Sequence, residues 1–123
     1  MEEVKFEFYR GDTYSRDFSI SGISSDITKV YFTVKENVED KKAVLQKTLG
    51  NGIVLTHEDK ENIIKYYNLT ICCTDTDNLK VDLDYVFDIE IHMPGTSDKP
   101  IKKTIITGTL RLKASSTRTC NEC

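Results

Sequence analysis

The sequence contains no tryptophan, only two prolines and no long apolar run. A membrane-spanning helix needs about 20 consecutive apolar residues, and no stretch of this chain approaches that length. The opening residues Met1-Glu-Glu-Val-Lys5 are acidic and lack the apolar segment of a secretory signal, so we expect synthesis in the cytoplasm without Sec export. Lysine and arginine are spread evenly through a chain of net charge -3, with no basic patch for nucleic acid. We therefore expect neither a membrane nor a nucleic-acid partner.

The common catalytic and cofactor motifs are also missing. The sequence has no phosphate-binding glycine loop, no dinucleotide fingerprint and no Gly-x-Ser-x-Gly elbow. Ser15, Ser19, His57 and Asp59 do not compose a catalytic triad. We expect a protein that is not an enzyme and that carries no cofactor.

Cysteine is present at four positions, as the adjacent pair Cys72 and Cys73 and as the Cys120-x-x-Cys123 pair. Reduced thiols are the default for a chain made in the cytosol. A zinc site and a disulfide remain alternatives, although adjacent strand residues point to opposite faces and supply at most one or two ligands to one ion.

The clearest pattern in the chain is the alternation of residues 84–92. Its apolar side chains fall on one face of an extended strand, and the sequence supplies four of them, Tyr85, Phe87, Ile89 and Ile91. Asp88, Glu90 and His92 fall on the opposite face. The pattern is typical of a strand with one face on a core and one in water.

Shorter patterns predict further strands and turns along the 123 residues, which suffice for one domain. We expect strands at 4–9, 14–20, 30–35, 43–49, 53–55, 64–73 and 101–113. Between them we expect a tight hairpin at Gly50-Asn-Gly52, a helical turn within 57–62 and a bulge at Gly108. About 7–8 short strands and no long helix predict an all-β fold, an antiparallel sandwich over residues 1–113 with a polar tail at 114–123.

A tyrosine near the start of 84–92 narrows the sandwich to the immunoglobulin-like class. In such folds a tyrosine at the start of strand F bonds back to the crossover that precedes it. Tyr85 holds that position, after a turn capped by Thr74 or Asp75 whose Leu79 points into the core. Strand F would then lie in one sheet with 30–35 and 101–113, with Phe32 and Phe87 in the core. The strands 4–9, 14–20 and 64–73 would form most of the other sheet.

The outward stripe of 84–92 is the first candidate site. Two carboxylates and an imidazole could bind a metal, but positions i, i+2 and i+4 of a strand spread over about 13 Å. Cross-strand pairing of Asp88 and Glu90 with Lys35, Lys103 or Arg111 is the preferred interpretation, in a solvated or partner-facing surface.

Outward tyrosines form the second candidate surface. Tyr9, Tyr31 and Tyr66 are expected to point away from the core, where aromatic side chains can bind sugar or another protein.

Three short motifs have ordinary structural explanations. Asp75, Asp77 and Asn78 resemble part of a calcium loop but lack its glycine and its later glutamate. Arg10-Gly-Asp12 spells an adhesion tripeptide at a predicted turn, and Asn68-Leu-Thr70 spells a glycosylation sequon within a predicted strand.

The order of these features also resembles a known group of proteins. The motifs that carry the resemblance are Phe8-Tyr-Arg-Gly-Asp-Thr13, Ile27-Thr-Lys-Val-Tyr-Phe-Thr-Val-Lys35, Gly50-Asn-Gly-Ile53, Asp84-Tyr-Val-Phe-Asp-Ile89 and Lys103-Thr-Ile-Ile-Thr-Gly-Thr-Leu110. They look like small structural proteins of phages and prophages of Gram-positive gut bacteria. They are also similar to the N-terminal immunoglobulin-like domain of siphophage upper baseplate proteins, without the helical and receptor-facing parts of those proteins.

The resemblance implies a non-enzymatic component of a tailed-phage virion, in the baseplate, tail, neck or head. Its partners would be other virion proteins in a symmetric homo- or hetero-oligomer, reached through edge strands, the loop 93–100 and the tails 1–3 and 114–123. A carbohydrate-binding β-sandwich module is the alternative.

Overall fold

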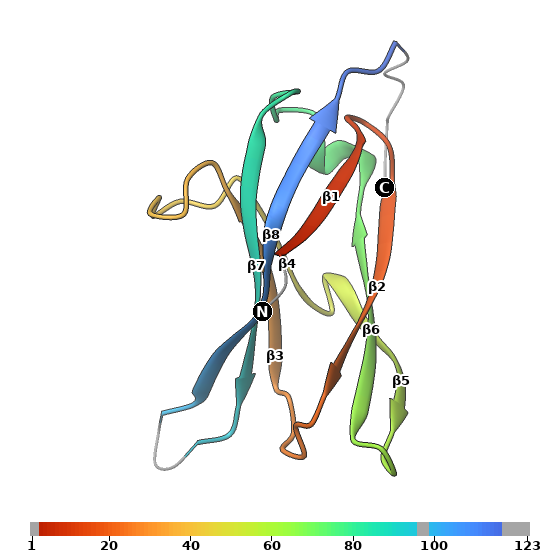
Figure 1. Ribbon diagram of the computed structural model, residues 1–123, viewed down its shortest axis with the longest axis vertical. Coiled ribbons are helices and arrows are strands. Elements are labelled where there is room, and N and C mark those ends of the chain that lie inside the picture. The colour runs from red at the N-terminus through yellow and green to blue at the C-terminus, as the bar shows by residue number, and fades with distance from the viewer. Residues whose placement is uncertain (1–2, 96–98, 117–123) are drawn as a thin grey trace.

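The computed structural model describes residues 3–95 and 99–116, which form eight strands and one short 3₁₀ helix (Figure 1). The elements are β1 (Glu3–Tyr9), β2 (Tyr14–Ser21), β3 (Lys29–Lys35), β4 (Leu45–Leu49), β5 (Gly52–Asp59), β6 (Ile64–Ile71), η1 (Cys73–Thr76), β7 (Asp84–Met93) and β8 (Ile101–Lys113). The strand order is β1-β8-β7-β3-β4-β5-β6-β2. The predicted all-β class is confirmed, and the eight strands form one mixed sheet, because β1 pairs with β8 and β4 with β5 in parallel.

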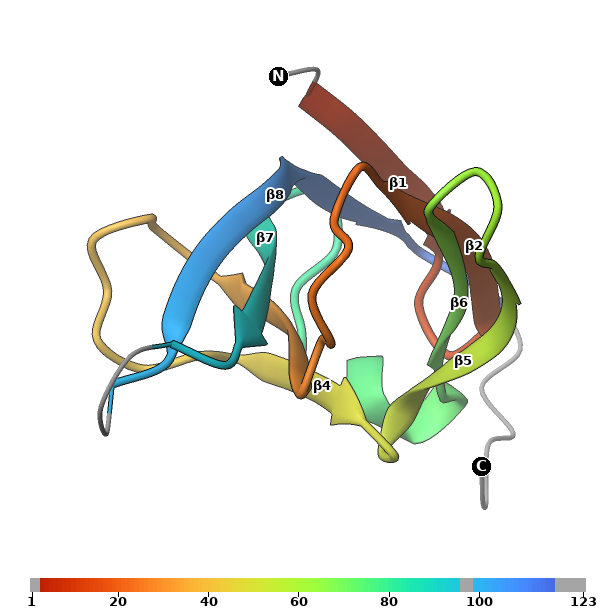
Figure 2. The same cartoon turned by 90° about the horizontal axis from the view of Figure 1, so that it is seen from below.

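The two halves of the sandwich are joined into one rolled sheet. Within residues 3–95 and 99–116, the first half, β1-β8-β7-β3-β4, pairs by backbone hydrogen bonds with the second half, β5-β6-β2, only at Thr48↔Gly52 and Leu49↔Ile53. The sheet curves round so that its two end strands, β1 and β2, approach each other (Figure 2). Phe6 of β1 and Tyr14 of β2 contact across this approach, with ring centroids 5.4 Å apart.

The core lies where the two halves face each other. The four predicted inward side chains of β7 are all buried, and so are Phe32 of β3 and Leu79 of the crossover. The second half supplies Tyr67, Leu69 and Ile71 from β6. These positions follow the period of two, because alternate residues of a strand face the same side.

The crossover from β6 to β7 has the predicted tyrosine corner. The backbone N–H of Lys80 donates a 2.8 Å hydrogen bond to the hydroxyl of Tyr85, whose side chain is buried. Asp75 holds the preceding turn, because its carboxylate accepts the backbone N–H of Cys72 at 2.7 Å. The chain is thus held on both sides of Leu79 as it passes between the two halves.

The prediction that strand 4–9 lies in the same sheet as 14–20 and 64–73 is wrong. β1 pairs with β8 in parallel register from Glu3↔Thr107 to Tyr9↔Lys113, and so joins the sheet of β7 and β3. The pairing depends on Gly108, where a Cβ would collide with the carbonyl oxygen of Val4 and the ring of Phe87. Gly108 is therefore needed for close packing, and the register shift of the β7–β8 ladder falls at Ile105 instead.

Two local predictions around β5 are also wrong. The Gly50 turn is tight, with reciprocal backbone hydrogen bonds between Thr48 and Asn51, but it leads β5 away to pair with β6 and not back along β4. The segment 57–62 is no helical turn, because β5 continues to Asp59, opposite Ile64 of β6.

Tyr85→Phe should lower the free energy of unfolding by about 1 kcal/mol, since it leaves the N–H of Lys80 without its partner. Urea denaturation measured by circular dichroism tests this. Tyr66→Phe is the matched control, because Tyr66 is an exposed tyrosine of β6, and it should be nearly neutral. Equal stability of Tyr85→Phe and the unchanged protein would contradict a tyrosine corner.

Candidate interaction site

The outward face of β3 and β7 carries the predicted polar stripe. Antiparallel register places Tyr31 opposite Glu90 and Thr33 opposite Asp88. All four side chains are half-buried, because the neighbouring strands crowd them on both sides. The stripe is therefore less solvated than its charges predict.

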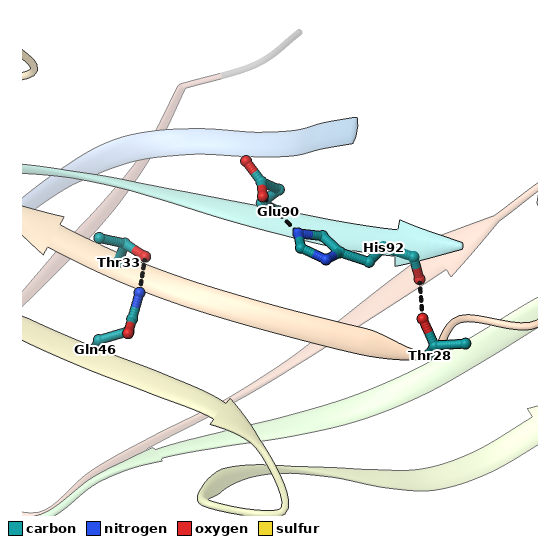
Figure 3. A network of polar contacts seen from close by, with 5 residues as sticks. All are labelled: Thr28, Thr33, Gln46, Glu90 and His92. Carbon is teal, nitrogen blue, oxygen red and sulfur yellow. Dashed lines mark hydrogen bonds and ion pairs between the residues drawn. The ribbon is translucent and has the colours of Figure 1, made fainter. Parts of the chain in front are cut away.

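His92 closes one end of this stripe (Figure 3). Its Nε2 lies 2.7 Å from Oε1 of Glu90, and its ring centroid is 5.0 Å from that of Tyr31. The backbone N–H and the hydroxyl of Thr28 both donate to the carbonyl of His92, at 2.8 and 3.1 Å. His92 is only 9% exposed. The imidazole is thus engaged inside the protein, on the face where the sequence predicted a solvated side chain.

A second polar contact lies on the same face, where the Nε2 amide of Gln46 donates to the hydroxyl of Thr33 at 3.0 Å (Figure 3). Within residues 3–95 and 99–116, no group of three histidine, cysteine or carboxylate side chains is placed to hold a metal ion. Glu90 is paired with His92, and Asp88 lies two residues away along the strand.

Asp88 is the electrostatically unusual residue of the stripe. Burial raises the pKa of its carboxyl, the nearby charge of Glu90 raises it further, and Lys35 opposes both. Asp88 lines a shallow hollow of about 220 Å³ together with Thr33, Val38 and Val86. This hollow can accept a small polar or apolar side chain.

The predicted charge pairing of the stripe is only partly correct. Arg111 pairs with Asp84 at 3.0 Å and reaches Asp82 at 4.0 Å, so it does not serve Asp88 or Glu90. In the β7–β8 ladder Asp84 stands directly opposite Arg111, which explains the choice.

The two candidate tyrosines, Tyr31 and Tyr66, lie on different halves of the sandwich. Tyr31 is on β3, and its neighbour Phe32 points into the core. Tyr66 is on β6, where its neighbour Tyr67 points inward. The two rings therefore belong to separate outer surfaces and cannot form one aromatic platform. Tyr66 instead stacks on His57 at a centroid distance of 5.6 Å.

Exposed apolar side chains gather on the hairpin formed by β5 and β6. Val54, Leu55, Ile63 and Tyr66 are 50%, 48%, 43% and 37% exposed. Beyond Ile53, β5 pairs with β6 on one side and with no other strand of the described chain. This hairpin thus combines a free strand edge with uncovered apolar surface, a combination that alternation alone did not reveal.

The turn of this hairpin contains a strained backbone. Ile63 has φ of 56°, in the left-handed region, which costs a residue with a Cβ about 1–2 kcal/mol. Glycine or asparagine is the usual residue in that conformation. Asp59 supports the turn by accepting the backbone N–H and the side-chain amide of Asn62, at 3.2 and 2.8 Å.

The short motifs are occupied by internal contacts. Asp75, which resembled a calcium ligand, forms a 2.6 Å ion pair with the buried Lys47. Arg10 of the adhesion tripeptide donates to the carbonyl of Leu79 at 3.1 Å, so its guanidinium faces the crossover. Asn68 of the sequon lies in mid-strand and donates its amide to Asp17 at 2.9 Å.

The cysteine prediction is corrected by the structure. Cys72 and Cys73 are both disulfide-bonded, and no cysteine of the described residues is a free thiol. Cys120 and Cys123 lie outside the described residues. The expectation of reduced thiols rested on the compartment of synthesis, which does not determine the redox state of the folded protein.

Comparison with known proteins does not assign this chain to a family. No protein-family model matches the chain, and no curated protein matches its sequence. Across residues 3–95 and 99–116, no helix has the length and apolar character needed to cross a bilayer.

Asp88→Asn should stabilise the protein at neutral pH, and the gain should disappear in acid. Burial raises the pKa of Asp88 in the folded protein above its ordinary 3.8. Protonated Asp88 therefore contributes fully to the free energy of unfolding below pH 3.8, and this contribution is lost as the pH rises through the pKa of the folded state. Lys35→Met should destabilise the protein at neutral pH, because it removes the positive charge that favours ionised Asp88. The free energy of unfolding should then fall further as the pH rises. Urea denaturation as a function of pH measures both variants. A pH profile unchanged in Asp88→Asn would contradict this account.

Alkylation before and after reduction should distinguish disulfides from thiols. Iodoacetamide reacts with the thiolate, so Cys72 and Cys73 of protein purified without reductant should stay unmodified in denaturant and become modified after reduction. Peptide mass spectrometry reads both positions, with a sample reduced first as the control. Modification of either cysteine before reduction would show that it is a thiol.

Proposed function

We propose that this chain is a non-enzymatic structural component of a tailed-phage virion, which assembles through protein–protein contacts. The observation that carries the proposal is the β5–β6 hairpin, where a free strand edge coincides with exposed Val54, Leu55, Ile63 and Tyr66. The resemblance of the motif order to that of phage structural proteins supports the virion as the place of assembly.

Two other strand edges, those of β2 and β4, support this choice of hairpin because each carries an inward-pointing charge. An inward-pointing charge on an edge strand opposes pairing with another chain. On the edge strand β2, Arg16 points inward, lies 4.9 Å above the ring of Phe6 and reaches the carbonyl of Lys5 at 3.4 Å. On β4, the inward Lys47 is held by Asp75.

β5 has a different surface. Its side chains from Val54 to Glu58 are exposed, and they include two large apolar residues. Val54 lies opposite Asn68, on the outer face that also carries Tyr66, whereas Leu55 lies opposite the inward Tyr67. A partner that covered Val54 and Tyr66 would remove apolar surface from water at about 25 cal/mol per Å². A bulge between Leu55 and His57 twists this edge, which favours a shaped partner surface over open-ended strand pairing.

The proposed partners are other virion proteins, in a symmetric homo- or hetero-oligomer within the particle. Copies made in the host cytoplasm would enter the virion by packing of preformed surfaces, with no covalent step. The partner-facing role of Tyr31, Asp88 and Glu90 belongs to the same proposal, because these residues lie on the outward face of the other half, where the hollow lined by Asp88 offers a second contact.

The carbohydrate-binding alternative has weaker support. Sugar recognition by a sheet uses aromatic rings gathered on one surface, and Tyr31 and Tyr66 lie on different halves. We therefore do not advance it as a second function.

Mass spectrometry and cryo-electron microscopy of purified particles test the proposal. The protein should be present at a fixed number of copies per particle, and its absence from the particles would overturn the proposal. Val54→Asp should reduce incorporation, because a charge on the exposed hairpin opposes its burial. Val44→Asp is the matched control, since Val44 is an exposed valine outside both the hairpin and the hollow that Asp88 lines, and it should be incorporated normally.

A further inference from the structure

At the tip of the β5–β6 hairpin, residues 58–65, the backbone conformation does not suit the residue that the sequence places there. Ile63 adopts a left-handed backbone that disfavours β-branched residues, yet its side chain is 43% exposed and adds little to the core. Strained residues of this kind concentrate at functional sites, where the surrounding structure holds them. The conflict therefore directs attention to what Ile63 contacts outside its own chain.

The hairpin tip is hydrogen-bonded to the loop between β2 and β3. The N–H of Gly22 donates to the carbonyl of Ile63 at 3.0 Å, and Nζ of Lys65 donates to the carbonyl of Ser25 at 3.0 Å. Both segments lie at the lower end of the molecule in Figure 1. A surface fixed in this way loses little conformational entropy when a partner binds.

The chemistry of the hairpin tip is self-complementary. Beside Ile63 is a hollow of about 200 Å³, which is also lined by Ile23, Glu58 and Lys60. Lys65 lines the hollow as well, but its ammonium group donates to the carbonyl of Ser25. The carboxylate of Glu58 and the ammonium group of Lys60 therefore flank the apolar side chain. A surface with both signs of charge around an apolar centre can pair with itself across a two-fold axis, as isologous interfaces do.

We propose that the hairpin tip binds the hairpin tip of a second copy of this chain. Ile63 of each copy enters the hollow of the other, and Glu58 of each copy faces Lys60 of the other. The inference rests on the proposed assembly function and names one of its partners, but it is tested on the isolated protein. If the isolated protein dimerises but is absent from virions, only the proposed virion role is overturned.

Sedimentation equilibrium up to about 1 mM protein measures this weak association. Ile63→Gly should weaken self-association by at least about tenfold and at the same time raise the midpoint of thermal unfolding. The two readouts move in opposite directions because glycine relieves the strain and removes the contact. Ile101→Gly is the matched control: Ile101 is an exposed isoleucine of β8 without positive φ, and this change should leave association unaltered and should not stabilise.

A charge exchange tests the two-fold arrangement. Glu58→Lys and Lys60→Glu should each be monomeric alone, because each places like charges across the axis. An equimolar mixture of the two variants should form a heterodimer, in which every facing pair is again of opposite sign. Thermal unfolding of each variant checks that it is folded.

The outcomes are decisive in each direction. A monomeric wild-type chain throughout the concentration range would overturn the inference, as would unchanged association of Ile63→Gly or a mixture that stays monomeric. A protein present in virions but monomeric at this surface would leave the structural role intact and remove only the second copy as its partner here.

Discussion

The crossover between β6 and β7 is the constraint on which the two halves of this sandwich depend. It is held by the carboxylate of Asp75, which accepts the N–H of Cys72 and pairs with Lys47. On its far side the hydroxyl of Tyr85 accepts the N–H of Lys80. Burying Lys47 is costly unless its charge is neutralised, so the ion pair links β4 of one half to the turn that leaves the other.

The need to neutralise inward-pointing charges also explains which groups surround the strand edges. The rolled sheet is open at two places, between β1 and β2 and between β4 and β5 beyond their short contact. Arg16 points inward at the first opening and Lys47 at the second, and each cation is held by protein groups. The β5–β6 hairpin is left with exposed apolar residues, so its surface is the part of the molecule that best fits a protein partner.

Local alternation was sufficient to identify most of the elements. The inward residues of β7 and β6 follow a period of two, and Tyr85 is distinctive because a tyrosine at the start of a strand after a capped turn has one common role. The place of β1 could not be read in this way, since Phe6 and Phe8 would be buried in either half. The parallel pairing with β8 depends on the bare backbone of Gly108 facing Val4, a contact more than a hundred residues apart in sequence.

The candidate site was less accessible to prediction than the fold. The charges of Asp88, Glu90 and His92 predicted a solvated face, but burial depends on neighbouring strands and on Thr28, which no local pattern includes. Ile63 gave no signal either, because a left-handed backbone at a β-branched residue is imposed by the closure of the hairpin. By itself the sequence determined which side chains face inward, because that property repeats every two residues. Only the tertiary structure decided which edges are guarded and which apolar residues remain exposed, because these follow from contacts between distant strands.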